Sequence, residues 1–443
     1  MKLLRSLYIN QKFFIALAVI GALFFIAFFI DWLFYFAAVL LGALIFAFFI
    51  DVFILYAIKK GVNAERFLPD RFSNGDNNLI RIKITNLYPF DLQTNCIDEI
   101  PFQFQKRDFN ISLKIQKNDS GEITYHLRPT ERGEYQFGKL NIYVKSVFKL
   151  IARRYIFSEN AIIPTYPSFM QMRKYDLIAS SNILTEYGIK RIRRIGHTME
   201  FEQIKDYNQG DDIRTINWKA SSKRNRLMVN QFQDEKSQPV YQVVDLGRTM
   251  QLSFNGLSLL DYAINSTLAL SNIILKKYDK VGLVCFSKKT ETMLHAERRS
   301  GQMEKLMEKL YNIQTDFSES DYGRLYIDIK QHIKQRSVIL LYTNFESMDG
   351  LRRQMTYLKN ISKYHVLIVI FFENTELNQL INSKAKTTQE VVDKVIAEKF
   401  AFEKRLIVSE LTKYGIQSIL TQPENLTINS INKYLELKSK GII

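Results

Sequence analysis

Between residues 240 and 246 the chain reads Val240-Tyr241-Gln242-Val243-Val244-Asp245-Leu246, an apolar run of strand length with a carboxylate near its end. Similar runs follow it, separated by segments in which apolar residues recur at helical spacing. This alternation predicts a mostly parallel, doubly wound α/β sheet. The further expected strands span 281–286, 337–342, 365–372 and 416–420, and the expected helices span 257–276, 303–313, 322–333, 350–361 and 389–414.

Side chains at the ends of these strands are the first candidates for a functional site. In open α/β sheets, ligands bind outside the carboxyl ends of the strands. We therefore expect Asp245, Ser287 and residues 343–345 to face one crevice.

The spacing of apolar residues is different in the region before the predicted sheet. From about residue 78 to residue 167 short apolar runs alternate with turn residues, as in Leu79-Ile80-Arg81-Ile82-Lys83-Ile84-Thr85. Alternation with a period of two is typical of half-buried strands, and the region predicts a β-sandwich-like domain. Pro164 and Pro167 resist continuation of a helix or a central strand, which places a boundary there.

The N-terminal region is apolar from residue 13 to residue 58 except at Asp31 and Asp51. A bilayer core of about 30 Å needs roughly 20 helical residues, so this length predicts two spans that reverse near Asp31. Basic residues flank both ends, and by the positive-inside rule this places both ends and the bulk of the chain in the cytoplasm. Asp51 is expected to reach the membrane interface. A cleaved signal peptide fits poorly, because the apolar stretch is too long.

Composition narrows the function classes. The 443 residues carry a formal net charge of +16 and contain two cysteines, which excludes a disulfide framework and a thiolate zinc site within one chain. The charge favours anionic neighbours such as phospholipid or nucleic acid. The predicted organisation is a transmembrane helical hairpin at 1–60, a β-sandwich-like domain at 61–165, a charged segment at 166–236 and the α/β domain at 237–443.

The run Asp245-Leu246-Gly247-Arg248-Thr249 resembles the start of a von Willebrand factor A domain. In that family an Asp-x-Ser-x-Ser loop, a distant Thr and an Asp hold Mg²⁺, a cation that prefers oxygen ligands. The resemblance implies a degenerate site here, because Gly247 lacks a hydroxyl and Asn344 replaces the expected Asp. The candidate ligands are Asp245, Thr249, Thr315 and Asn344.

Arg248 suggests a second interpretation of the same site. The loss of one hydroxyl ligand and one negative charge weakens Mg²⁺ binding. Arg248 is then expected to neutralise Asp245 in place of a cation, so that no cofactor is bound. A plain capping role for Asp245 between strand and helix remains as a structural alternative.

The segment before the sheet carries the most distinctive motifs: Glu200-Phe201, Asp206-Tyr207, Gly210-Asp211-Asp212-Ile213-Arg214, Ile216-Asn217-Trp218-Lys219 and Leu227-Met228-Val229. Their order is very similar to the signature of the bacterial family called Domain of Unknown Function 58. That family pairs the signature with an A-type domain behind a membrane hairpin, so the resemblance implies the inner membrane of a bacterium. The turn at residues 146–150 departs from the family's usual Asp-Pro-Phe-Gly.

Two interpretations of this signature stay open. Asp211 and Asp212 follow a glycine, as in a turn and helix N-cap, and nearby cations can pair with the acids in a partly buried network. Alternatively, the signature forms a surface recognised by a partner protein. The residues concerned are Glu200, Asp206, Asp211, Asp212, Arg214, Asn217, Trp218 and Lys219.

The expected role is recognition rather than catalysis. The sequence has no phosphate-binding Gly-rich loop, no nucleophile elbow and no His-Glu-x-x-His helix. The family resemblance implies association with a MoxR-type AAA+ ATPase in envelope-related assembly, and so an adaptor or scaffold. The competing classes are a metal-dependent hydrolase at Asp245 and an anionic lipid or nucleic-acid binder; no known nucleic-acid motif accompanies the basic residues.

Overall fold

The computed structural model describes residues 6–158, 160–180, 200–208, 211, 213–233, 237–385 and 387–442. The chain divides into two compact units, Met1–Tyr166 and Pro167–Ile443. Each unit has its own core and is described separately below. Two residues of the expected signature, Gly210 and Asp212, lie outside the described residues.

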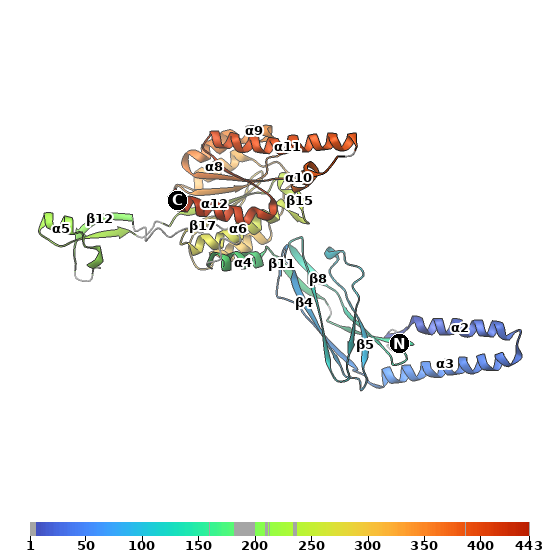
Figure 1. Ribbon diagram of the computed structural model, residues 1–443. Helices are drawn as coiled ribbons and strands as arrows, with labels where there is room; N and C mark the ends of the chain where they lie inside the picture. The colour runs from blue at the N-terminus through green and yellow to red at the C-terminus, as the bar shows by residue number, and fades with distance from the viewer. Residues whose placement is uncertain are drawn as a thin grey trace. The chain divides into compact units, whose positions relative to one another are not determined.

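The first unit begins with two apolar helices that pack side by side, α2 (Gln11–Ala27) and α3 (Asp31–Ala57) (Figure 1). The chain reverses between them at residues 28–30, close to the expected position. Helix α3 is long and apolar enough to cross a membrane, whereas α2 is a shorter apolar helix of 17 residues. A short strand that the sequence did not reveal, β1 (Leu7–Ile9), precedes α2 and pairs with β10.

Three sheets surround the core of the first unit. Their strand orders are β1-β10-β9-β5-β6, β3-β11-β8 and β2-β4-β7. The predicted alternation is exact in β4, where Ile80, Ile82 and Ile84 are fully buried and the residues between them are not. The strands are β2 (Val62–Phe67), β3 (Phe72–Ser73), β4 (Asn78–Asn86), β5 (Leu92–Asp98), β6 (Ile111–Ile115), β7 (Ser120–Leu127), β8 (Gly133–Phe137), β9 (Leu140–Lys145), β10 (Ile151–Phe157) and β11 (Ala161–Tyr166).

The end of α3 is fixed to the sheets of this unit. Leu55 is fully buried in the core, and Arg153 on β10 donates to the backbone oxygens of Leu55, Ile58 and Lys59 at 2.5–2.9 Å. These carbonyls have no partner within the helix, so the guanidinium caps its C-terminus. Asp51 is fully buried against the β9–β10 turn, where it accepts the hydroxyl of Ser146.

The second unit contains a six-stranded mixed sheet with strand order β18-β17-β14-β19-β20-β21. All neighbours pair in parallel except β18, an antiparallel edge strand that the sequence did not reveal. The strands are β14 (Pro239–Asp245), β17 (Lys280–Phe286), β18 (Thr290–Glu297), β19 (Val338–Tyr342), β20 (Val366–Phe372) and β21 (Gln417–Thr421).

Helices cover both faces of this sheet (Figure 1). Val240 and Val244 point into a core shared with α6, α7 and α12, while Tyr241 and Val243 point into a core shared with α8, α9 and α11. This opposite orientation follows from the period of two along a strand. The helices are α6 (Leu259–Lys276), α7 (Gln302–Tyr311), α8 (Tyr322–His332), α9 (Met348–Tyr364), α10 (Thr375–Asn382), α11 (Thr388–Lys413) and α12 (Leu426–Ser439).

Two short strands, β15 (Ser253–Phe254) and β16 (Leu257–Ser258), pair between β14 and α6. The helices and strands that precede the sheet in the second unit include α4 (Phe169–Ser180), β12 (Glu200–Asp206), α5 (Trp218–Arg224) and β13 (Met228–Gln233). Helix α4 packs on α6, and the backbone N–H of Ser168 donates to Asn265 at 2.8 Å. Strands β12 and β13 pair antiparallel in a two-stranded sheet of their own.

Candidate functional site

The carboxylate of Asp245 lies at the carboxyl end of β14 and is only 2% exposed. Its Oδ1 accepts the backbone N–H of Gly247 at 2.8 Å and the hydroxyl of Ser320. Its Oδ2 accepts the hydroxyls of Thr343 at 2.7 Å and Tyr322 at 3.2 Å. These donors are neutral, so the carboxylate is stabilised by oriented dipoles of the protein.

Burial sets the protonation behaviour of this cluster. It raises the pKa of Asp245, and hydrogen bonds from Ser320 and Thr343 work in the opposite direction. Burial also raises the pKa of Tyr322 well above its ordinary value, and the nearby Asp245 charge raises it further. Tyr322 therefore remains a hydrogen-bond donor throughout the physiological pH range.

Gly247 makes room for this arrangement. A Cβ at position 247 would lie 2.2 Å from the Ser320 hydroxyl and 3.3 Å from the backbone oxygen of Ser318. A serine at position 247 would therefore collide with the hydroxyl that now reaches Asp245. Gly247, which departs from the von Willebrand factor A pattern, leaves space for Ser320 to donate its hydroxyl to Asp245.

The other predicted cation ligands are placed differently. Thr249 accepts a hydrogen bond through its backbone oxygen from the side chain of Asn344 at 3.4 Å. Thr315 lies in the loop after α7 and is not among the donors described for Asp245. Within the residues that the structure describes, no three His, Cys, Asp or Glu side chains are grouped closely enough to hold a metal ion.

Arg248, expected to neutralise Asp245, lies beside Glu319 instead. Its Nη2 lies 3.6 Å from Oε1 of Glu319, and both side chains are more than half exposed. An exposed pair of this kind contributes little to stability. Ser287, expected in the same crevice, instead donates to Glu291 and Asp316 at 3.2 and 3.3 Å.

Lys404 on α11 is a site residue that the sequence analysis did not identify. Its Nζ donates to Oδ1 of Asn344 at 2.7 Å and to the backbone oxygen of Phe345 at 2.5 Å. Burial lowers the pKa of Lys404 to about 8, although the charge of Glu346 opposes this change. Asn344, which replaces the expected metal-binding Asp, thus accepts from an ammonium group.

Two cavities adjoin at this edge of the sheet. The smaller, of about 110 Å³, lies over Asp245 and is bordered by Arg248, Arg353 and Glu319. The larger, of about 400 Å³, is mainly apolar and is lined by Phe254, Phe372, Leu377, Phe400 and Leu420 together with Lys404. Asn344 and Glu346 line both cavities, so a ligand that spans this edge can contact the polar and the apolar part together.

The signature segment forms a separate feature around β12, α5 and β13. Asn217 caps α5: its side chain accepts the N–H of Ala220 at 3.0 Å and donates to Asn230 at 2.9 Å. Asp211, expected at a helix N-cap, instead accepts from the backbone of Asn208 and from Lys205, each at 2.9 Å. These hydrogen bonds lower the pKa of Asp211.

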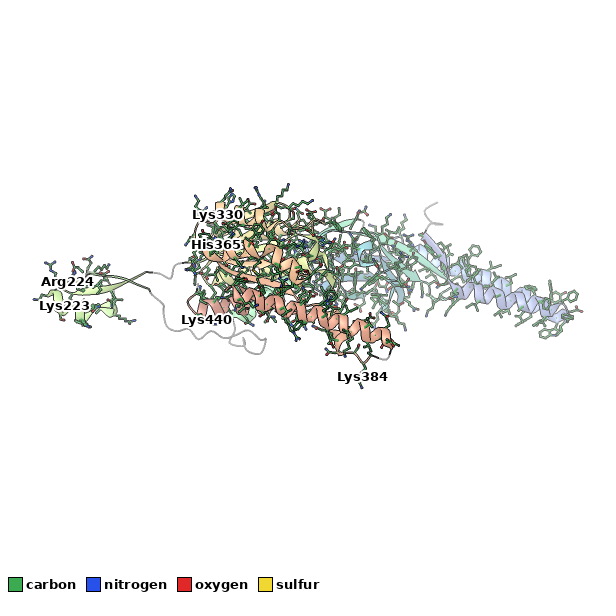
Figure 2. All side chains as sticks on the ribbon, turned by 90° about the horizontal axis from the view of Figure 1, so that it is seen from above. Lys223, Arg224, Lys330, His365, Lys384 and Lys440 are labelled. Carbon is green, nitrogen blue, oxygen red and sulfur yellow. The ribbon has the colours of Figure 1, made fainter. Side chains whose placement is uncertain are left out.

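The surface of this segment is apolar and basic. Trp218 and Ile213 are each 68% exposed, which a buried network around Trp218 would not produce. The exposed cations of this segment include Arg214, Lys219, Lys223, Arg224 and Arg226. Figure 2 labels Lys223 and Arg224 among them. Glu200 and Asp206 begin and end β12.

The comparisons with known proteins concern parts of the chain. A family profile described as "Protein of unknown function DUF58" matches residues 203–390. The "Uncharacterized protein YeaD" of Bacillus subtilis (strain 168) is 24% identical over 123 residues, which is 28% of this chain. The match spans only 30% of the length of that relative.

Two solved structures show weak likeness. The conserved hypothetical protein BatB from Bacteroides thetaiotaomicron is 14% identical with a TM-score of 0.31, and the match covers 46% of this chain and all of that one. The PapD-like domain 7 of human CEP192 is 9% identical with a TM-score of 0.19, covering 24% of this chain and 85% of that domain. Likenesses at this level do not define the fold.

Proposed function

We propose that this protein is a membrane-anchored adaptor, which presents the edge of its α/β sheet to a partner protein in the bacterial cytoplasm. Helix α3 supplies one span, and the neighbouring α2 supplies a second that is about 25 Å long at 1.5 Å per residue. Lys12 lies at the start of α2, and Lys59 and Lys60 follow α3, so the positive-inside rule places this end of both helices in the cytoplasm.

The α/β sheet is, in this proposal, a degenerate von Willebrand factor A-like domain. Its support is the parallel order of β17, β14, β19 and β20, the helices on both faces, and the acidic residue that ends β14. The cation of such a site is replaced by neutral hydroxyls on Asp245. Since both carboxylate oxygens already accept two hydrogen bonds each, Asp245 has little capacity left for Mg²⁺.

The two adjoining cavities, which share Asn344 and Glu346, are the observation that carries the proposal. An apolar pocket next to a small polar crevice suits an anchoring side chain of a partner and the polar groups beside it. Exposed charges of both signs, Arg248, Arg353, Glu319 and Glu346, form the rim. Such a rim provides specificity and orientation rather than catalysis.

The exposed Trp218 surface provides a second contact for the same role. Tryptophan and arginine are the residue types that most often dominate binding energy at protein interfaces. The surrounding cations favour a partner with an acidic face. The resemblance to the DUF58 family supports a MoxR-type AAA+ ATPase, acting in envelope-related assembly, as that partner.

Cross-linking and recovery of the full-length protein from native membranes tests this proposal. With nucleotide trapped, the wild type is expected to recover an AAA+ ATPase. Phe400→Ser should lose that protein, because Phe400 lines the apolar pocket. Phe402→Ser is the matched control: Phe402 is on the same helix and 59% exposed, but does not line the pocket. Absence of an AAA+ ATPase from the wild-type sample would contradict the proposed partner.

A further inference from the structure

The turn between β9 and β10 exposes two neighbouring apolar side chains. Val147 is 53% exposed and Phe148 is 52% exposed, although Ser146 before the pair and Leu150 two residues after it are buried. Neighbouring exposed apolar side chains are a feature of surfaces that bind a partner or a membrane. The surroundings of the turn indicate which partner that is.

The turn is attached to the inner end of α3. Oδ2 of Asp51 accepts the hydroxyl of Ser146 at 2.5 Å and the backbone N–H of Leu150 at 3.2 Å. Oδ1 of Asp51 accepts the backbone N–H of Phe148 at 3.3 Å. The acid inside the apolar helix therefore binds the turn, while the side chains of Val147 and Phe148 stay free to point outward.

Helix α2 is attached to the same turn. Asn10, the residue at the N-cap of α2, donates its backbone N–H to Leu150 at 2.8 Å and its side-chain amide to Lys149 at 3.0 Å. Both helices of the hairpin thus meet the turn where they join the β-stranded part of the first unit. The level of Asn10 and Asp51 along the helices fixes the level of the turn.

Helix geometry places that level at a membrane boundary. From Asp31 to Asp51 there are 20 residues, which rise about 30 Å along an α-helix. This is the thickness of the hydrocarbon core. If Asp31 lies at the outer surface, Asp51 and the turn it binds lie at the inner surface.

The charges near the turn suit an anionic leaflet. Lys145 and Lys149 flank the apolar pair, and Lys12 lies in the first turn of α2. Asp51, the acid that contacts the turn, is fully buried. Cations beside exposed apolar side chains are the combination by which proteins contact anionic membrane surfaces.

We propose that the turn at residues 146–150 is a membrane-surface contact, in which Val147 and Phe148 enter the inner leaflet and Lys145 and Lys149 approach anionic headgroups. This inference rests on the proposed membrane anchoring and adds a contact made by the β-stranded part of the unit. It gives that part a fixed orientation on the bilayer.

Fluorescence quenching on the full-length protein in vesicles of phosphatidylethanolamine and phosphatidylglycerol tests this contact. An environment-sensitive nitrobenzoxadiazole probe is attached to Val147→Cys or Phe148→Cys, and the vesicles contain spin-labelled lipid. Both probes should lose most of their emission. The substitutions leave the backbone N–H groups that bind Asp51 in place, and native Cys96 and Cys285 are buried, so the unsubstituted protein gives the labelling background.

Two control positions separate the possible failures. Leu79 is 45% exposed on β4. It lies about 26 Å, in the strand direction, from Leu87, whose backbone N–H donates to Gly61 just after α3. A probe on Leu79→Cys should therefore keep its emission. Phe36 on α3 is 49% exposed and should be quenched.

The two controls distinguish a failure of the turn contact from a failure of the membrane anchoring. If the Phe36 probe is quenched and the turn probes behave like Leu79, the membrane contact of the turn is overturned while the anchoring stands. An unquenched Phe36 probe would overturn the anchoring and the contact together. Blue-shifted but unquenched turn probes would indicate a protein cover and would also overturn the contact.

Discussion

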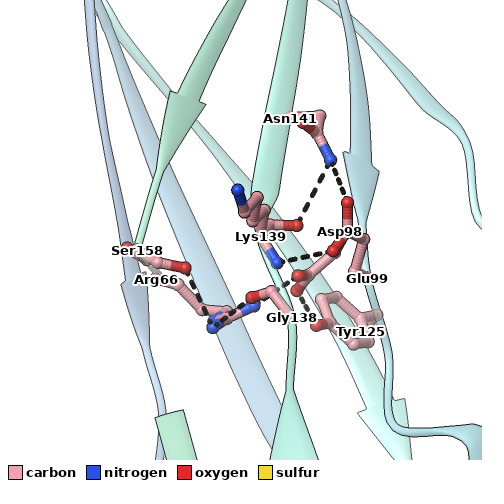
Figure 3. A network of polar contacts seen from close by, with 8 residues as sticks. All are labelled: Arg66, Asp98, Glu99, Tyr125, Gly138, Lys139, Asn141 and Ser158. Carbon is pink, nitrogen blue, oxygen red and sulfur yellow. Dashed lines mark hydrogen bonds and ion pairs between the residues drawn. The ribbon is translucent and has the colours of Figure 1, made fainter. Parts of the chain in front are cut away.

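Asp98 in the first unit and Asp245 in the second are both buried carboxylates, but they are stabilised in opposite ways. Asp98 pairs with Arg66 at 2.5 Å, with both side chains fully buried, and accepts the hydroxyl of Tyr125 at 2.5 Å (Figure 3). Among the described residues, the donors to Asp245 are all neutral. The first carboxylate is matched by a full opposite charge, whereas the second is held by dipoles at the floor of a crevice.

The two carboxylates therefore have different roles: Asp98 stabilises the fold, and Asp245 belongs to the proposed recognition site. A buried ion pair fixes the arrangement of the strands around it, since removal of either partner leaves an uncompensated charge. When the donors are neutral hydroxyls, the position of the carboxyl group depends less on its charge. The same contrast applies to cations: Arg66 meets a carboxylate, while Lys404 meets an amide oxygen and a backbone oxygen.

The largest effect is expected for Arg66→Met. Asp98 would remain buried without its counter-charge, and the first unit should lose about 3–5 kcal/mol of stability. Hydrogen exchange of β4, β5 and β7 in increasing urea, followed by mass spectrometry, measures this loss within the full-length protein. The double variant Arg66→Met/Asp98→Leu should recover much of it. A loss in the single variant below about 1 kcal/mol would mean that the pair is not a structural element.

Lys404→Met should remove a pH dependence from the second unit. The folded-state pKa of Lys404 is lowered to about 8, so between pH 8 and the ordinary lysine pKa the unfolded chain binds more protons. Stability of the wild type should therefore rise with pH across this window, by about 1.4 kcal/mol for each unit of pKa lowering.

The control for Lys404 lies on the same helix. Lys399 is exposed on α11, and Lys399→Met should leave the pH dependence unchanged. Exchange of β19 and α11 measured at pH 8 and at pH 10 gives the comparison. Equal pH slopes for Lys404→Met and the wild type would show that Lys404 is solvated as an ordinary surface lysine.

The smallest change is expected for Asp245→Asn. Asparagine keeps one acceptor oxygen, its NH2 group can donate to the Thr343 and Tyr322 hydroxyls once these rotate, and no opposite charge is left unpaired, so the cost should stay near about 1 kcal/mol. Asp98→Asn should cost several times more, because Arg66 would lose its counter-charge. Exchange protection of β14 and β5 in the two variants provides the measurement. Equal losses would remove the distinction between the two carboxylates.

The sequence predicted the regular parts of both units because their signals are local. The period of two in residues 79–85 and the apolar run that ends at Asp245 each depend on neighbours in the chain. The rule that strand ends share an edge also anticipated that Thr343 and Asp245 lie together, and their side chains are 2.7 Å apart.

The features that the sequence did not predict depend on distant contacts. Ser146 meets Asp51 across 95 positions of the chain, Ser320 meets Asp245 across 75, and Lys404 meets Asn344 across 60. No spacing rule connects such residues. Gly247 is the one local signal that could have helped, because a glycine where a hydroxyl residue was expected leaves space for another side chain.

A magnesium titration of the full-length protein tests the cation-free nature of the Asp245 crevice most directly. Thermal unfolding and exchange at β14 are followed in the wild type and in Asp245→Ala. We predict that Mg²⁺ changes the two proteins equally, because the carboxylate oxygens already accept hydrogen bonds from Gly247, Ser320, Tyr322 and Thr343. A melting temperature raised by Mg²⁺ in the wild type but not in Asp245→Ala would contradict this account.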